Sequence, residues 1–445
     1  MGTFNSTGTG GNWTDDSTWA EAGQPAADGT DYVVITAGDT VVLTGHTGTG
    51  AISIQGEITG AGYTLTLNGS GDSPLVNFDG TITATSNLNL TIEADENNTI
   101  DCLGTGTFNN VIIDNVGYTT TLTHTLECAT LTITAGTLDT GSNKTLTVTG
   151  QCAVAGTLTC NGSTVSVGSG LTNTLGMLVQ TNGTLTGGTG PHTYGTFNAD
   201  ASGTVNVTLT SDTTTINGSY TDGIAFAMRS GVTFSAGGGD IHFTGSGNQY
   251  LYERNNTART LGDVTVNKSG GNFQWYNGGG AHYTMASLTI TAGTFATNEI
   301  TSGTSKDLTV TEKTTIGDAS HSSEDQATLT CNASVISLGS GKTDDYAIIM
   351  LAGGTFAGGI GTHTTGAIKQ TVANTKFTFT SGTTTINSEY TSEDRMFELT
   401  NGKAYNADGR ITLTGNFTSC IQWTGPSGDT GPHNLRINAA SLTMH

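Results

Sequence analysis

The sequence predicts an all-β protein, an elongated parallel β-helix (a solenoid) with an N-terminal cap and a duplicated module. Three observations predict this fold: a composition rich in threonine and glycine, short apolar strings separated by turn residues, and longer strings that occur twice. Each observation bears on a different level of the fold, namely the secondary structure, the stacking of strands and the domain organisation.

The composition of the 445-residue chain favours strands over helices. Threonine makes up about a fifth of the residues, 65 residues are glycine, only 5 are proline, and 11% are charged. Threonine is β-branched and fits a pleated surface, whereas glycine permits tight turns. Apolar strings such as 33–35, 131–133 and 348–350 recur along the chain. The chain can therefore bury a thin core spread over many rungs, which a disordered chain cannot do.

Apolar and threonine-rich strings of four to six residues recur about every ten residues, separated by Gly, Asn, Ser or Asp. This spacing suits either a β-sandwich or a solenoid. A sandwich would bring longer strands, more proline and a larger aromatic core. Short threonine-rich strands with Gly and Asn corners favour the parallel β-helix, in which like residues stack rung over rung.

Several strings occur twice, which predicts two equivalent modules. The offset between the copies grows from about 157 to about 171 residues, so we expect an insertion in the second copy, at Gly317 to Gln326. The matched strings are 131–137 with 288–294, 158–161 with 329–332, and 213–217 with 383–387. The predicted parts are an N-terminal cap with the first rungs (1–110), a first module (111–263), a second module (264–434) and the truncated start of a third (435–445).

The N-terminal string from Gly11 to Trp19, followed by Pro25 and the apolar strings 32–35 and 41–43, carries a resemblance. It resembles the entry segment ahead of right-handed parallel β-helices in the "β-strand repeat" proteins of bacteriophage virions and bacterial surfaces. The chain departs from that pattern at its Gly-Asp step, where it has Gly-Thr-Asp. Physically, Trp13 and Trp19 are interpreted as a structural cap over the first rung, and the alternative is ligand binding.

Charge and targeting signals exclude some classes of partner. The net charge is −22, and clustered basic residues are lacking, which argues against a nucleic-acid partner. The chain has no apolar run of about 18 residues, so we expect no membrane insertion. The N-terminus resembles no signal peptide, which indicates either that the general secretory route is not used or that a leader has been replaced.

No cofactor or metal site is predicted. The six cysteines form no C-x-x-C pair and are interpreted as small buried hydrophobic residues rather than disulfides. Cys160 and Cys331 occupy the same string in the two copies, which indicates packing. Acidic pairs such as Asp15-Asp16 and Asp344-Asp345 lack the repeat that a calcium site requires.

We also predict no catalytic residues. Glycoside hydrolysis needs two carboxyl groups across a groove, and the candidates are Asp240 with Glu253 and Asp263, and Glu393 with Asp394. Asp240 is matched by Asp408 in the second copy, which indicates a turn position. Recurring histidines are likewise expected at turns, in structural roles, and these are His192, His363 and His433.

The stretch from Gln249 to Tyr283 is unusually aromatic for a chain that is 7% aromatic. Exposed Tyr and Trp side chains stack on sugar rings and anchor protein interfaces. Three interpretations stay open: packing at the junction between modules, a protein interface and a glycan-binding platform. The candidate binding residues are Tyr250, Tyr252, Arg254, Phe273, Trp275, Tyr276 and Tyr283.

The resemblance and the lack of a catalytic pattern together favour a non-enzymatic structural protein of a bacteriophage virion, either a capsid decoration or a tail fibre or spike component. The alternatives are a bacterial cell-surface adhesin or filament subunit, outside the cell, and a glycan-binding or glycan-depolymerising spike. If the last rung of the solenoid leaves its strand edge open, the unpaired backbone groups of that edge need to be covered by another chain. We therefore expect a homo-oligomer or contacts with other virion proteins, and a surface glycan is a further possible partner.

Overall fold

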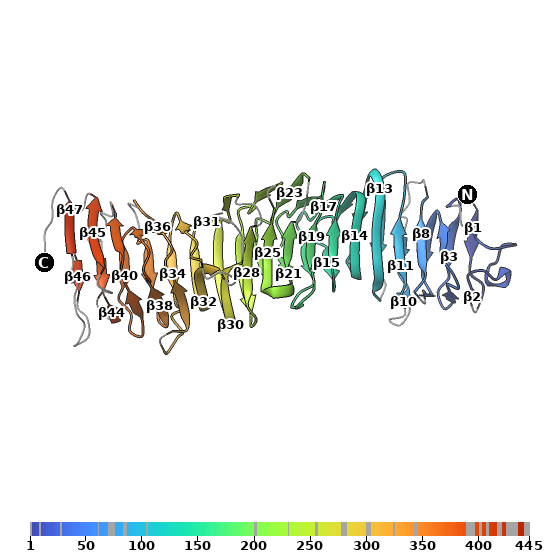
Figure 1. Ribbon diagram of the computed structural model, residues 1–445. Helices are drawn as coiled ribbons and strands as arrows, with labels where there is room; N and C mark the ends of the chain where they lie inside the picture. Colours follow the sequence, from blue (N-terminus) through green and yellow to red (C-terminus); the bar gives the residue numbers. More distant parts are fainter. Residues whose placement is uncertain are drawn as a thin grey trace. The chain divides into compact units, whose positions relative to one another are not determined.

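The computed structural model confirms an all-β solenoid. About 13 turns of stacked parallel strands make up the fold, and 1% of the chain is helical. The structure describes residues 2–8, 10–26, 29–60, 62–69, 76–82, 87–103, 106–199, 203–229, 231–253, 257–276, 283–299, 304–323, 325–341, 346–388, 397–399, 403–405, 409–415, 421–423 and 435–439. The chain divides into two compact units, one of residues 1–214 with 231–237 and one of residues 215–230 with 238–445. Figure 1 shows the strands of each unit following one another in chain order.

The first unit consists of short strands on either side of two long ones, β13 and β14. Its first strands are β1 (Thr3–Asn5), β2 (Gly10–Asn12), β3 (Tyr32–Ile35), β4 (Thr40–Val42), β5 (Thr47–Thr49), β6 (Ala51–Ile54), β7 (Glu57–Thr59), β8 (Thr64–Leu67), β9 (Val76–Phe78), β10 (Thr81–Ile82), β11 (Asn89–Ile92) and β12 (Asn98–Cys102). Its later strands are β13 (Phe108–Leu122), β14 (Leu126–Asp139), β15 (Thr145–Val148), β16 (Cys152–Val154), β17 (Thr157–Thr159), β18 (Thr164–Val167), β19 (Met177–Val179), β20 (Thr184–Thr186), β21 (His192–Tyr194), β22 (Phe197–Ala199), β23 (Val205–Thr208) and β26 (Val232–Ser235). Two short 3₁₀ turns, Asp16–Thr18 and Thr221–Gly223, lie one in each unit, and β24 (Thr214–Ile216) lies where the units divide.

The second unit contains the remaining strands. They are β25 (Ile224–Met228), β27 (Asp240–Gly245), β28 (Gln249–Glu253), β29 (Arg259–Thr260), β30 (Asp263–Trp275), β31 (Tyr283–Met285), β32 (Leu288–Glu299), β33 (Leu308–Val310), β34 (Thr314–Ile316), β35 (Ala327–Thr330), β36 (Ile336–Leu338), β37 (Ile348–Met350), β38 (Gly354–Ala357), β39 (His363–Thr365), β40 (Ile368–Gln370), β41 (Lys376–Thr378), β42 (Thr383–Asn387), β43 (Phe397–Leu399), β44 (Lys403–Tyr405), β45 (Arg410–Gly415), β46 (Ile421–Trp423) and β47 (Leu435–Ala439).

In the rungs where the three strands of a coil are separate, each strand pairs in parallel with the third strand further along the chain. For example, β15 pairs with β18, β16 with β19 and β17 with β20. One coil therefore carries three strands, and its corners bring the chain round to start the next coil. This parallel stacking excludes the β-sandwich alternative, because a sandwich is built from antiparallel sheets.

The core is a stack of apolar side chains, in which residues of successive rungs lie in register. Leu158 of β17 pairs with Leu185 of β20, which pairs with Val207 of β23, and all three are buried. Successive side chains of a strand point to opposite faces, so the flanking threonines of β17 and β20, such as Thr157 and Thr184, form files on the outer surface. The abundance of threonine follows directly from this alternation.

The duplicated strings occupy equivalent places in the two units. Cys160 and Cys331 are both fully buried, and each carbonyl oxygen accepts a 2.7 Å hydrogen bond from a buried threonine, Thr140 or Thr297. The next corner needs glycine in both copies. A Cβ on Gly188, which has φ 73°, would lie 1.7 Å from the carbonyl oxygen below it, and Gly359 is in the same position at 1.8 Å. Only glycine permits this approach of two backbones.

The second copy is lengthened at two points. The offset between matched residues is 157 for Thr140 and Thr297, and 171 for Leu158 and Leu329. Ten residues, 317–326, separate β34 from β35, whereas two residues separate the matching strands β16 and β17. The expected insertion at 317–326 is therefore present, and the remaining extra residues lie between Thr297 and β33.

Candidate functional site

The two N-terminal tryptophans lie beside the first rung. Trp13 and Trp19 are buried, their rings are 5.2 Å apart in an edge-to-face arrangement, and Phe4 adds a second edge contact to Trp19. Nε1 of Trp19 donates to the carbonyl oxygen of Trp13 at 2.9 Å. Ser6 and Trp19 form an antiparallel bridge next to β1, which itself pairs in parallel with β3. Burial of this kind fits packing over the end of the first rung better than an open ligand site.

The aromatic stretch separates into an inward and an outward group. On the inner side, Phe273 and Trp275 of β30 are buried, and Tyr283 of β31 stacks on Trp275 at 5.3 Å with the rings nearly parallel. Phe273 also contacts the rings of Phe243 and Phe295, which belong to neighbouring rungs. These residues pack the core, as the packing interpretation expects. Of the remaining candidates, Arg254 lies outside the described residues.

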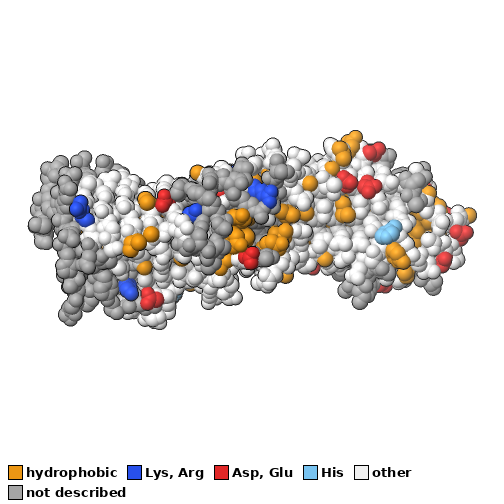
Figure 2. Space-filling model, in the orientation of Figure 1, with side chains coloured by type: hydrophobic (Ala, Val, Ile, Leu, Met, Phe, Trp, Pro, Cys, Tyr) orange, Lys and Arg blue, Asp and Glu red, His pale blue; other side chains and the backbone are white. Residues whose placement is uncertain are grey.

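The outward group comes from β28 and the end of β30. Leu251 and Gln249 point inward, so Tyr250 and Tyr252 point outward, and Tyr276 follows β30 on the neighbouring rung. The ring of Tyr276 stacks on Tyr250 at 5.9 Å and meets Tyr252 edge-on at 5.1 Å. Figure 2 shows hydrophobic side chains gathered over the region of β25 and β28, with a basic and an acidic side chain beside them.

A carboxylate completes this outward group. The hydroxyl of Tyr276 donates to Oδ2 of Asp222 at 3.2 Å, across 54 residues of sequence. Partial burial, followed by the Asp222 side chain, raises the pKa of the Tyr276 hydroxyl. Tyr250, Tyr252, Tyr276 and Asp222 together are called the tyrosine patch below. Tyr250 is its covered floor, and Tyr252 and Tyr276 are half-buried.

The turn that carries Asp222 is tightly fixed. Asp222 has φ 62° and ψ 13°, a left-handed conformation that is uncommon for residues other than glycine. Gly223 lies so close to the ring of Tyr250 that a Cβ would be 2.5 Å from it. The turn therefore packs closely against Tyr250, and the hydrogen bond from Tyr276 links its carboxylate to the patch.

The last residue of β28, Glu253, forms a buried ion pair. Nε of Arg259 is 3.4 Å from Oε2 of Glu253, and both side chains are almost completely buried. A terminal nitrogen of Arg259 also donates to the carbonyl oxygen of Arg229 at 2.7 Å. Burial, and then the Glu253 carboxylate, raise the pKa of the Tyr283 hydroxyl. Glu253 is thus engaged inside the core and does not face an open groove.

Of the other acidic candidates for glycoside hydrolysis, only two lie next to each other among the described residues. Asp240 and Asp263 pair on adjacent rungs, and Asp263 accepts a 2.5 Å hydrogen bond from the hydroxyl of Ser287. Asp240 begins strand β27, so the expectation of a turn position is wrong, and Nε2 of His242 lies 3.8 Å from its Oδ2. Glu393, Asp394 and Asp408 lie outside the described residues.

The histidines expected at turns are instead inside the solenoid. His192 begins β21 and His363 begins β39, and both are buried. Their strings follow glycine-rich corners, and the alternation of the strand points the first residue inward. Burial lowers the pKa of each imidazole to about 4, with the Asp212 charge partly opposing this for His192. His433 lies outside the described residues.

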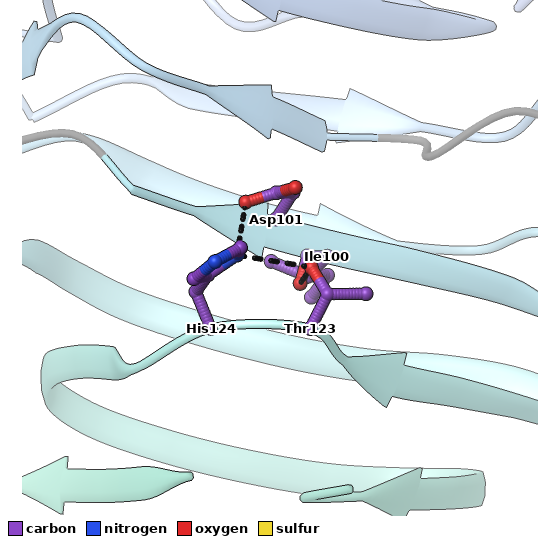
Figure 3. Close-up of polar contacts among 4 residues, drawn as sticks. All are labelled: Ile100, Asp101, Thr123 and His124. Atoms are coloured by element: carbon purple, nitrogen blue, oxygen red, sulfur yellow. Dashed lines mark hydrogen bonds and ion pairs between the residues drawn. The ribbon is translucent and has the colours of Figure 1, made fainter.

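One polar contact on the first unit was not expected from the sequence. Nδ1 of His124 lies 2.6 Å from Oδ1 of Asp101, and the neighbouring Thr123 hydroxyl donates to the carbonyl oxygen of Ile100 at 3.3 Å (Figure 3). The pair is partly exposed, and a pair of this kind contributes little stability. Within the described part of the chain, no three His, Cys, Asp or Glu residues are placed to hold a metal ion.

A scan of protein-family models finds no match to this chain, and searches of curated proteins and of solved structures also find none. No helix in the described ranges is long and apolar enough to cross a membrane.

Proposed function

We propose that this chain is a non-enzymatic structural protein of a bacteriophage virion, a capsid decoration or a tail fibre or spike component. The observation that carries the proposal is the in-register piling of apolar side chains along both units, which gives a repeating scaffold with small hydroxyl side chains outside. The resemblance of the N-terminal entry segment to virion and surface β-helices supports the virion assignment.

The engagement of the acidic residues supports a non-enzymatic role. Glycoside hydrolysis requires two carboxyl groups facing a groove, one of them free to donate a proton. Glu253 is instead neutralised by Arg259 in the core, and Asp263 is hydrogen-bonded to Ser287. A scaffold of this kind acts through its surface, with other copies or other virion proteins as partners.

Immunogold electron microscopy with antibodies against the chain tests the proposal. Gradient-purified virions should carry gold particles, and mass spectrometry of the same fraction should find the chain at a fixed ratio to the major capsid protein. Labelling of bacterial envelopes with none on virions would contradict the proposal and favour the cell-surface adhesin.

A glycan-binding spike is the second candidate, favoured by one specific observation. The tyrosine patch presents partly exposed aromatic rings beside a carboxylate, on an outer surface that elsewhere carries mainly threonine. Release of reducing ends from host capsule would be needed to extend this candidate to a depolymerase.

A further inference from the structure

We propose that the tyrosine patch is a saccharide-binding site selective for neutral or amino sugars. The site belongs to the outer face of β25, β28 and the end of β30, and it stands independently of the virion role. Its parts are the rings of Tyr252 and Tyr276, the floor made by Tyr250, and the Asp222 carboxylate.

The rings supply a surface for the apolar face of a pyranose. An aromatic face carries partial negative charge and accepts polarised C–H groups. Tyr276 meets Tyr252 at 73° and Tyr250 at 28°, so the three rings form an angled surface rather than a flat stack. The half-buried rings of Tyr252 and Tyr276 are the ones that a sugar ring would contact, because Tyr250 is covered.

Asp222 supplies directional hydrogen bonding. A carboxylate has two oxygens with about four acceptor positions, and Tyr276 uses one of them. The hydrogen bond from Tyr276 orients the Asp222 carboxylate, which lowers the side-chain freedom lost when a sugar hydroxyl or ammonium group binds.

The negative charge of the site and of the chain selects between neutral, basic and acidic saccharides. The chain has a net charge of −22, and the acceptor at the edge of the patch is an acid. Uronic acids and sialic acids would be repelled, whereas neutral hexoses and amino sugars would not. The buried Arg259 does not change this selection, because it is neutralised by Glu253.

The matching strands of the second copy show that the fold does not require a tyrosine here. Leu251 pairs with Phe226 on the rung before, and Ile421 pairs with Phe397 in the same way. This register places Gln422 where the first copy has Tyr252. The same register position therefore takes a tyrosine in one copy and a glutamine in the other.

Saturation-transfer difference NMR on the full chain tests the site. The probes are cellohexaose and the hexamers of N-acetylglucosamine and glucosamine, with hexagalacturonic acid as the acidic comparison. We expect saturation of ring C–H protons in at least one neutral or amino hexamer and none in the acidic one. Tyr276→Ala and Asp222→Gly should each weaken binding about tenfold, from lost stacking and a lost charged acceptor.

The variants are chosen to preserve the fold. Asp222→Gly suits the positive φ of that position, and Tyr118→Ala is the matched control, because Tyr118 is an exposed tyrosine of the first unit. Circular dichroism and thermal unfolding verify each variant. The proposal is overturned if no neutral or amino hexamer binds, if the acidic hexamer binds more tightly, or if Tyr118→Ala weakens binding as much as Tyr276→Ala.

Discussion

Acidification should destabilise each unit of the solenoid through one buried histidine. His192 and His363 begin equivalent strands, and their side chains are 1% and 3% exposed. His192 contacts the Tyr194 hydroxyl through Nδ1 at 2.9 Å, whereas His363 packs edge-on against the ring of Phe356. Both imidazoles are therefore neutral in the folded protein at pH 7.

The magnitude follows from the two pKa values of each group. An unfolded histidine has a pKa near 6.5, and burial lowers the folded value to about 4 for both residues. A lowered folded pKa means that the stabilising contribution is complete above pH 6.5 and is lost as the pH falls toward 4. Each histidine then removes about 2 kcal/mol between pH 7 and 5, and about 3 kcal/mol by pH 4.

Guanidinium unfolding of the wild type, His192→Gln, His363→Gln and the double variant at pH 7, 6 and 5 measures this effect. Glutamine does not titrate, so the difference in unfolding free energy between wild type and variant isolates the histidine from all carboxylates. His46→Gln, which removes an exposed histidine, controls for the loss of an imidazole as such. We expect the difference to change by about 2 kcal/mol per buried histidine from pH 7 to 5. A difference independent of pH would refute the reasoning.

Three further predictions concern single sites. Trp19→Ala should lower the unfolding free energy of the first unit by about 3–5 kcal/mol, because it removes a buried ring from the first rung; thermal unfolding equal to the wild type would contradict the cap. Glu253→Ala should cost about 3–5 kcal/mol by leaving Arg259 buried and unpaired, whereas the double variant Glu253→Met with Arg259→Leu should recover much of that loss in chemical denaturation. Cys160 should resist iodoacetamide in the folded protein and react after unfolding, since burial raises the pKa of its thiol to about 12; mass spectrometry that finds the native thiol modified would show an open core.

The fold could be predicted because its evidence is repeated many times in the sequence. Each string such as Leu-Thr-Ile-Thr alternates apolar and hydroxyl residues, and this alternation alone assigns inner and outer faces within a strand. The duplication adds an internal check, because Cys160 and Cys331 would have to share an environment, and they do. The insertion at 317–326 was visible because the strings on either side keep their register.

The division of the aromatic stretch could not be predicted, because a bulge interrupts the alternation. Val264, Val266 and Lys268 point inward along β30, but the register shifts between Asn267 and Asn272. A shift of one residue turns every following side chain to the other face. The inward positions of Phe273 and Trp275 therefore depend on how many residues the bulge takes up, which composition and spacing leave open.

Buried polar residues were missed for a different reason. Lys268 is 2% exposed, and its Nζ donates to the carbonyl oxygen of Gly247 at 2.7 Å and to Oε1 of Gln249 at 3.1 Å. Burial lowers the pKa of this lysine to about 8. Lysine is almost never fully buried unless it is paired, and its partners here lie on the previous rung. The contact between Asp222 and Tyr276 could not be predicted either, because the Asp-Gly pair indicates only a turn and the two residues are 54 positions apart.

The two copies separate what the scaffold needs from what the surface can vary. Inside, several matched positions keep the same residue, as with Cys160 and Cys331 or His192 and His363, because a rung stacks best on a rung of similar shape. Outside, Tyr252 stands at the register position of Gln422, and the stack accepts both. A solenoid of this kind can change its binding surface one outward residue at a time without disturbing the core beneath it. Outward residues that differ between the two copies are therefore the best indicators of a binding function, and Tyr252 of the tyrosine patch is one of them.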